Sequence, residues 1–145
     1  MRILVINGPN LNMLGKRDKY HYGTLTLKDI NKELKRRKKD NKITFFQSNY
    51  EGKIVSKIQK SLNYDAIILN LGAYTHQSIA IRDALELFDG IKVEVHLSDV
   101  YDREGFRKIN YISDIVDKSF IGEKENSYYK ALEYILNSKE NWKNI

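Results

Sequence analysis

Hydrophobic and polar positions along the chain follow two alternating spacings. Short aliphatic or aromatic runs, typical of strands, alternate with longer stretches in which apolar residues recur every three or four positions, which is typical of helices. The predicted strands are residues 2–7, 43–47, 65–71, 91–97 and the shorter run 119–121. The predicted helices are residues 26–39, 51–62, 76–88 and 126–137. The remaining residues, 138–145, are predicted to form a frayed tail.

This alternation predicts an α/β protein with a parallel sheet that is covered by helices on both faces. Five strands of this size favour a flavodoxin-like three-layer fold with the strand order 2-1-3-4-5. A chain of 145 residues without a linker or an internal change of composition is predicted to be a single domain, residues 1–145. Ligands of such folds bind beyond the carboxyl ends of the strands, so candidate chemistry is expected after the first, third and fourth strands.

Composition excludes several classes of protein. A hydrophobic content of 41% and a charged content of 30% are typical of globular proteins and exclude a disordered chain. The absence of cysteine excludes disulfides, thiolate metal sites and cysteine nucleophiles. The apolar runs are far shorter than the ~20 residues that span a bilayer. The amino-terminal residues lack the pattern of a secretory signal. A cytoplasmic location without membrane association is therefore expected.

The net charge of +6 raises the alternative of a basic RNA-binding protein. Much of the excess lies in the five consecutive basic residues 35–39, which end a predicted amphipathic helix. Cations at the carboxyl end of a helix interact favourably with the negative end of the helix dipole. No aromatic residue is interleaved with them for stacking on bases. This pattern favours a solvated helix end, and no nucleic-acid partner is expected.

The segment after the first strand, residues 7–23, is long for a connection between a strand and a helix. It contains neither a dinucleotide fingerprint nor a phosphate loop, which counts against a flavodoxin-like carrier of a flavin or nucleotide. It does contain Arg17, Tyr20 and Tyr22. An ordinary phenol, with a pKa near ~10, ionises poorly at neutral pH, and a close guanidinium favours the phenolate. The two tyrosines therefore either only line the loop or are candidates for a catalytic general base.

Two further groups of polar residues follow the third and fourth strands. Thr75 is predicted to cap a helix, and His76 beside it either donates to a ligand hydroxyl or lies on the surface. Glu94 and His96 share one face of a strand, where the carboxylate could orient the imidazole as in a catalytic triad. The alternatives are a polar stripe on an edge strand, or a metal site formed by these two residues with His76.

Several separate blocks of the sequence, in order and at matching spacing, resemble type II dehydroquinase, the 3-dehydroquinate dehydratase family. The blocks are residues 7–11 (NGPNL), 14–17 (LGKR), 22–23 (YG), 25–27 (LTL), 47–49 (QSN), 67–70 (IILN), 75–76 (TH), 81–84 (IRDA), 94–98 (EVHLS), 103–104 (RE), 106–107 (FR) and 111–113 (YIS). The chain departs from the family's pattern mainly at residues 118–119 and 123–127, around the last predicted strand.

The resemblance implies a single catalytic domain that removes water from 3-dehydroquinate by an anti elimination through an enolate, giving 3-dehydroshikimate. By position, Tyr22 would be the general base, and Arg17 would hold it as a phenolate. Asn10 would hold a water that stabilises the enolate. His96 would be the general acid, oriented by Glu94.

The resemblance also implies how the substrate binds. Its carboxylate would contact Asn70 and the backbone of Leu97 and Ser98. His76 and Arg107 would hold the ring hydroxyls of the substrate. Asp83 would reach into the site from a neighbouring subunit. Because family members assemble as dodecamers built from trimers, a homododecamer is expected. The implied reaction needs no metal and no cofactor.

Overall fold

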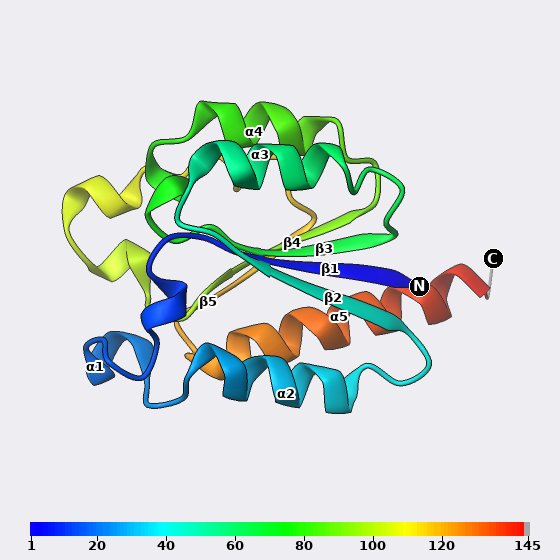
Figure 1. Ribbon diagram of the computed structural model, residues 1–145, viewed down its shortest axis with the longest axis horizontal. Helices are drawn as coiled ribbons and strands as arrows, with labels where there is room; N and C mark the ends of the chain where they lie inside the picture. Colours follow the sequence, from blue (N-terminus) through cyan, green and yellow to red (C-terminus); the bar gives the residue numbers. More distant parts are fainter. Residues whose placement is uncertain (144–145) are drawn as a thin grey trace.

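The computed structural model describes residues 1–143 and contains a five-stranded parallel sheet between two layers of helices (Figure 1). Its strands are β1 (Arg2–Asn7), β2 (Lys42–Gln47), β3 (Ala66–Asn70), β4 (Ile91–His96) and β5 (Lys118–Ile121). Every neighbouring pair is parallel, and the order is β2-β1-β3-β4-β5. The predicted flavodoxin-like α/β fold and its strand order are therefore confirmed.

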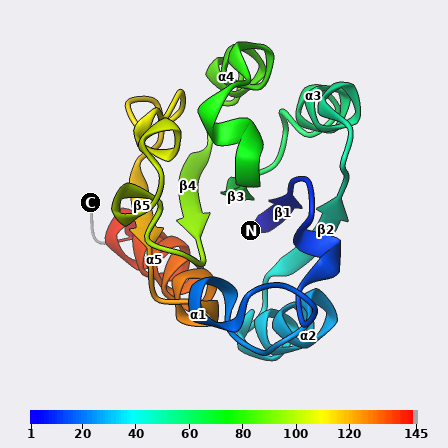
Figure 2. The same cartoon turned by 90° about the vertical axis from the view of Figure 1, so that its left-hand side faces the viewer.

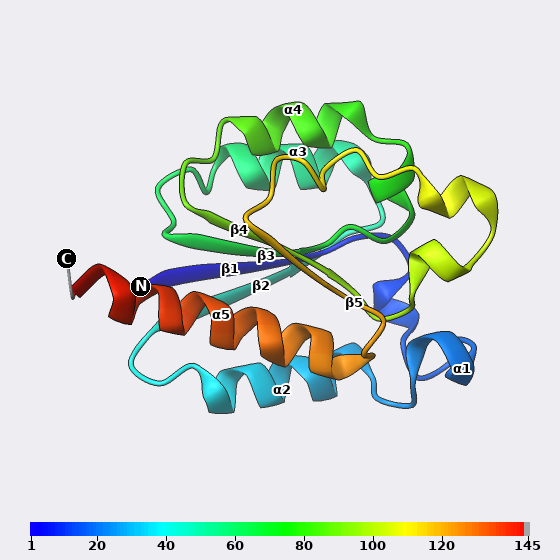
Figure 3. The same cartoon turned by 180° about the vertical axis from the view of Figure 1, so that it is seen from behind.

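Helices α2 (Leu27–Arg37) and α5 (Glu125–Lys143) cover one face of the sheet, and α3 (Glu51–Gln59) and α4 (Ile79–Glu86) cover the other (Figures 1 and 3). Successive side chains of a strand point to opposite faces. In β1, the odd-numbered apolar residues pack with the α2 and α5 layer, and the even-numbered ones pack with the α3 and α4 layer. This explains why the inner strands are continuous apolar runs rather than alternating ones.

Side-chain caps mark the starts of α2 and α4. At the start of α2, the Thr26 hydroxyl accepts from the Asp29 N–H, and the Asp29 carboxylate accepts from the Thr26 N–H. The predicted cap at Thr75 is wrong, because residues Gly72–His76 form a 3₁₀ turn, η2. Ser78 caps α4 instead, by accepting from the Ile81 N–H. His76 therefore precedes α4 rather than lying in its first turn.

All four predicted helices end at residues other than those expected, and the differences are largest for α3 and α5. Helix α3 ends at Gln59, and Leu62, placed on its buried stripe, is 41% exposed. Helix α5 continues to Lys143, so the frayed tail predicted from residue 138 is wrong for 138–143, while 144–145 lie outside the described residues. No glycine or proline interrupts residues 125–143, which explains why the helix does not stop earlier.

The carboxyl ends of the strands meet at one end of the molecule, onto which Figure 2 looks. The long segment after β1 folds into the 3₁₀ turn η1 (Leu11–Met13) and the one-turn helix α1 (Lys19–Tyr22). The segment after β4 folds into two more 3₁₀ turns, η3 (Val100–Asp102) and η4 (Gly105–Lys108). These irregular segments surround the strand ends. Within the described residues, no helix is both long and apolar enough to cross a bilayer.

Candidate active site

A cavity of about 100 Å³ lies at the carboxyl ends of β1, β3 and β4. It is lined from the segments after these strands, as the rule for ligand sites in open parallel sheets predicts. The sequence-predicted residues that line it are Asn10, Arg17, Tyr22, Asn70, His76, His96, Leu97, Ser98 and Arg107. Glu94 is fully buried and bonded to His96, and Asp83 is exposed on α4, away from the cavity.

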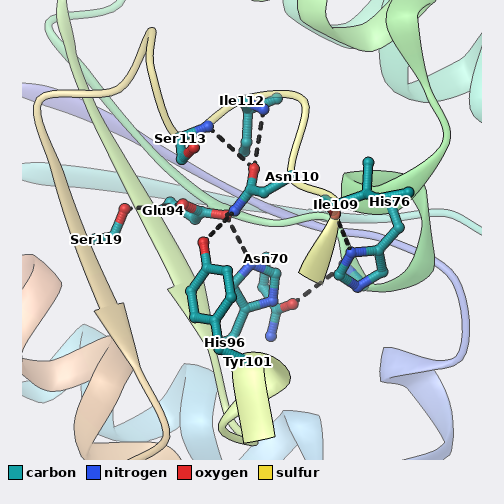
Figure 4. A network of polar contacts seen from close by, with 11 residues as sticks. Asn70, His76, Glu94, His96, Tyr101, Ile109, Asn110, Ile112, Ser113 and Ser119 are labelled. Atoms are coloured by element: carbon teal, nitrogen blue, oxygen red, sulfur yellow. Dashed lines mark hydrogen bonds and ion pairs between the residues drawn. The ribbon is translucent and has the colours of Figure 1, made fainter. Parts of the chain in front are cut away.

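Glu94 and His96 form a buried pair at the end of β4 (Figure 4). The His96 Nε2 lies 2.7 Å from Glu94 Oε2. The same Oε2 accepts from Asn110 Nδ2 at 2.7 Å, and Oε1 accepts from the Ser119 hydroxyl at 2.8 Å. A carboxylate with three donors is held in one orientation, and the imidazole bonded to it is held with it.

The charge on Glu94 follows from the balance of these contacts. Burial opposes ionisation, but the hydrogen bond and charge of His96, with the hydrogen bonds from Asn110 and Ser119, outweigh it and lower the pKa of Glu94 below its ordinary value. Glu94 is therefore an acceptor at neutral pH, and His96 donates to it through Nε2–H. The ring nitrogen Nδ1 of His96 has no hydrogen-bond partner among the described residues, which leaves it available for a ligand.

Asn110 and Ser119 were not identified from the sequence. Asn110 belongs to an irregular segment, where its Oδ1 accepts from the N–H groups of Ile112 and Ser113 while its Nδ2 reaches Glu94 (Figure 4). Ser119 lies directly opposite Glu94 in the register of β4 and β5. Pairing the fourth and fifth predicted strands in this register would have placed Ser119 beside Glu94, whereas no periodic pattern of the sequence indicates Asn110.

His76 faces the same cavity in a different state. Its Nδ1 lies 2.6 Å from the carbonyl oxygen of Ile109, so Nδ1 carries the proton. Burial lowers the pKa of His76, and the charges of His96 and Arg107 lower it further, against the opposing effects of Ile109 and Glu94. A neutral ring then presents Nε2 as an acceptor. This differs from the donor role that the sequence suggested for His76.

Tyr22 lies between two guanidinium groups. Arg103 Nη1 donates to Tyr22 Oη at 2.6 Å and to the Ser98 hydroxyl at 3.2 Å. The guanidinium carbon of Arg17 lies 3.6 Å from the centre of the Tyr22 ring. Burial lowers the pKa of Arg17, and the neighbouring Arg103 and Arg107 lower it further, while Tyr22 raises it. The cavity is thus positively charged around one phenol oxygen.

Arg103 is a site residue that the sequence reasoning did not single out. It lies 81 positions from Tyr22 in the chain, in the segment after β4, and only the fold brings the two together. Its side chain is 10% exposed and reaches the cavity. Its Nε is buried without a hydrogen-bond partner among the described residues, and lies 3.7 Å from a Glu104 oxygen.

The loop that carries Asn10 is fixed by its contacts with the end of β2. Asn10 has a left-handed backbone conformation, with φ 69°, and its N–H donates to Asn49 Oδ1. Gln47 Nε2 donates to the same Asn49 oxygen and to the carbonyl of Gly8. These bonds use the backbone of Asn10 and place it against the cavity, and its side chain has no hydrogen-bond partner in the described part of the chain, so it is available for a ligand or a water.

In the alternative of a metal site, Glu94 would be a ligand, but both of its carboxylate oxygens already accept hydrogen bonds, from His96, Asn110 and Ser119. The ring nitrogen Nδ1 of His76 is bonded to Ile109, and Nε2 of His96 is bonded to Glu94. Across the part of the chain that the structure describes, no three histidine, aspartate or glutamate side chains are grouped to hold an ion. The arrangement instead offers a phenol with two guanidinium groups and a carboxylate–imidazole pair in one small cavity.

Comparison with known proteins identifies the family of the chain. Residues 1–136 match the family model described as Dehydroquinase class II. The 3-dehydroquinate dehydratase of Bartonella henselae is 50% identical over 139 residues, 94% of each chain. That of Thermotoga maritima is 45% identical over 142 residues, 97% of this chain and 98% of the relative. A crystal structure of type II dehydroquinase from Butyrivibrio crossotus superposes with a TM-score of 0.89 at 40% identity, covering 93% of this chain and 97% of that one. The chain therefore belongs to the class II dehydroquinase family.

Proposed function

We propose that this chain is a 3-dehydroquinate dehydratase, a hydro-lyase that removes water from 3-dehydroquinate to give 3-dehydroshikimate. Its family membership and its similarity to enzymes of that name support the activity. The observation that carries the mechanism is one cavity holding both the Tyr22 hydroxyl, with its two guanidinium neighbours, and the His96 ring, with Glu94 behind it. An elimination through an enolate needs one base and one acid in a single site.

In this proposal, Tyr22 acts as the general base. The Arg103 hydrogen bond and the Arg17 guanidinium over the ring stabilise negative charge on the phenol oxygen. The phenolate takes a proton from the carbon beside the substrate ketone, and the electron pair of that C–H bond forms the enolate. A water held by Asn10 donates a hydrogen bond to the enolate oxygen, which stabilises the charge that develops there.

His96 then acts as the general acid. The enolate collapses to restore the ketone, a carbon–carbon double bond forms, and the carbon–oxygen bond to the departing hydroxyl breaks. That hydroxyl takes a proton from His96 Nδ1 and leaves as water. The ionised Glu94, 2.7 Å from the other ring nitrogen, stabilises the imidazolium before transfer and fixes its orientation.

The remaining cavity residues would bind the substrate. Asn70 and the backbone of Leu97 and Ser98, at the ends of β3 and β4, are proposed to hold the carboxylate. The neutral His76, through its free Nε2, would accept from one ring hydroxyl, and Arg107 would donate to another. Three arginines in the cavity suit an anionic substrate.

We also propose that the protein forms a homododecamer built from trimers, in which Asp83 completes a neighbouring site. Asp83 is exposed on α4 and does not line the cavity of its own chain, which supports a role in another subunit. Large apolar side chains nearby are exposed, including Ile79 at 55% and Leu87 at 56%. Their burial would favour association. Light scattering that gives the mass of twelve chains supports this assembly, and the mass of one chain contradicts it. The cytoplasmic location stays a prediction.

The activity is tested by ultraviolet absorbance after 3-dehydroquinate is added to purified protein that has been treated with a chelator. A rise in absorbance from the conjugated enone product is expected. No rise from folded, assembled protein would contradict the proposed function. A rise that requires added metal would contradict the metal-free mechanism.

A further inference from the structure

Beneath the cavity, on the side of α5, one phenol hydroxyl is completely enclosed. Tyr128 is 0% exposed, and its side chain extends from α5 to the ends of β1 and β3. Its hydroxyl donates to Asn7 Oδ1 and accepts from Asn70 Nδ2 at 2.8 Å. Asn7 and Asn70 are the last residues of their strands and lie opposite each other in the register. Tyr128 thus bridges two adjacent strand ends below the site.

The direction of these bonds fixes the amide of Asn70. Asn70 Oδ1 accepts from the Gly72 N–H at 3.3 Å, while one hydrogen of Nδ2 goes to the Tyr128 hydroxyl. A flipped amide would place a donor against the Gly72 N–H and an acceptor against an oxygen whose hydrogen is already given to Asn7. The observed orientation leaves the second Nδ2 hydrogen free, and Asn70 lines the cavity.

We propose that Tyr128 is a positioning residue for substrate binding: its hydroxyl holds the Asn70 amide so that an N–H points at the substrate carboxylate. The inference rests on the proposed function, because it assigns a role through Asn70 in that site. Tyr128 itself does not line the cavity and contacts no reacting group.

Burial gives this arrangement a physical reason. A hydroxyl enclosed in an apolar layer is costly unless both its donor and its acceptor capacity are used, as they are here. Burial also raises the pKa of Tyr128 far above neutrality, so the hydroxyl keeps its hydrogen and the chain of bonds keeps its direction. Phenylalanine would fill the same space without any of these demands. The hydroxyl is therefore best explained by what it orients.

The test compares Tyr128→Phe with Tyr129→Phe in steady-state turnover of 3-dehydroquinate. Tyr129 is the adjacent residue of α5, does not line the cavity, and loses the same hydroxyl, so it is a matched control. Tyr128→Phe is expected to raise KM about tenfold, which corresponds to ~1.4 kcal/mol, and to leave kcat within about twofold. Tyr129→Phe is expected to leave both unchanged. An unchanged KM in Tyr128→Phe overturns the proposal.

A double-variant cycle separates positioning from a purely structural role. If Tyr128 acts through Asn70, then Tyr128→Phe adds no further increase in KM to Asn70→Ala. Independent, multiplying effects overturn the proposal. If Tyr128→Phe fails to fold, Asn7→Ala replaces it, because it removes the acceptor that directs the hydroxyl hydrogen; a normal KM in that variant also overturns the proposal. Wild-type protein without turnover contradicts the proposed function itself, whereas these variants bear only on Tyr128.

Discussion

Arg103 offers a sharp test of how the phenol oxygen of Tyr22 is activated. The substitution Arg103→Met removes the guanidinium while keeping an unbranched side chain of moderate length. It deletes the 2.6 Å hydrogen bond to Tyr22 Oη and the 3.2 Å bond to the Ser98 hydroxyl. Because the site is enclosed and the Arg103 side chain is only 10% exposed, water would stabilise negative charge on the Tyr22 oxygen poorly in place of the guanidinium. The variant therefore isolates the contribution of one positive charge to the base.

The size of the effect follows from electrostatics. Two unit charges about 4 Å apart attract by ~4 kcal/mol at an effective dielectric constant of ~20. At ~1.36 kcal/mol per factor of ten in rate, losing an attraction of this size in the reacting state corresponds to a rate loss on the order of 10³-fold. Arg17 remains over the ring and compensates in part, so the expected loss in kcat is about 10²- to 10³-fold.

The assay measures kcat of Arg103→Met and of wild type from the absorbance of the enone product at neutral pH. Arg17→Met serves for comparison and is expected to lose less, since its guanidinium carbon faces the ring centre rather than the hydroxyl. A folded Arg103→Met enzyme with kcat within about threefold of wild type at neutral pH would refute the reasoning.

Three further predictions concern acid stability, the support of the acid group, and the packing of the first loop. The pKa of Glu94 is lowered in the folded state from its ordinary value of 4.5, so the ionised carboxylate stabilises the fold above that value, and this stabilisation is lost as the pH falls through the folded pKa. In urea unfolding, the free energy of unfolding of wild type should therefore decline in acid, and Glu94→Gln should flatten that decline. An equally steep decline in the variant would contradict this prediction. Asn110→Ala should lower kcat about tenfold with KM unchanged, because it removes the hydrogen bond to the Glu94 oxygen that holds the His96 imidazole. Ser119→Ala should lower kcat less, because Ser119 donates to the other Glu94 oxygen. Equal losses of kcat in the two variants would count against this ordering. Gly8→Ala should lower the melting temperature strongly, because the added Cβ would lie 2.3 Å from a backbone oxygen. Gly52→Ala, whose Cβ would have no atom within 4 Å, should instead stabilise helix α3 by about 0.5–1 kcal/mol. Equal melting temperatures of the two variants would refute the packing argument.

The fold could be predicted from the sequence because its signals are local. Residues 2–7 and 65–71 are apolar runs whose neighbours have helical spacing, and these two periods determine the layers of an α/β sheet. Helix limits were less predictable. Thr75 and Ser78 are equally good caps by residue type, and only the 3₁₀ turn over Gly72–His76 decides between them.

The site could be predicted in part for a similar reason. Parallel strands bring their carboxyl ends together, so the segments bearing Tyr22 and His96 were expected to meet, and both line one cavity. Arg103 and Asn110 could not be found by that rule. They come from the irregular segment after β4, where no periodicity indicates which side chains turn inward.

The central claim, that the phenolate of Tyr22 removes the proton, is tested most directly by Tyr22→Phe with turnover and substrate binding measured on the same preparation. The substitution removes only the hydroxyl that Arg103 contacts. General-base catalysis contributes about 10²- to 10⁴-fold, so kcat is expected to fall by a factor in that range while calorimetry still detects binding of 3-dehydroquinate. Turnover near the wild-type rate would contradict the assignment of the base.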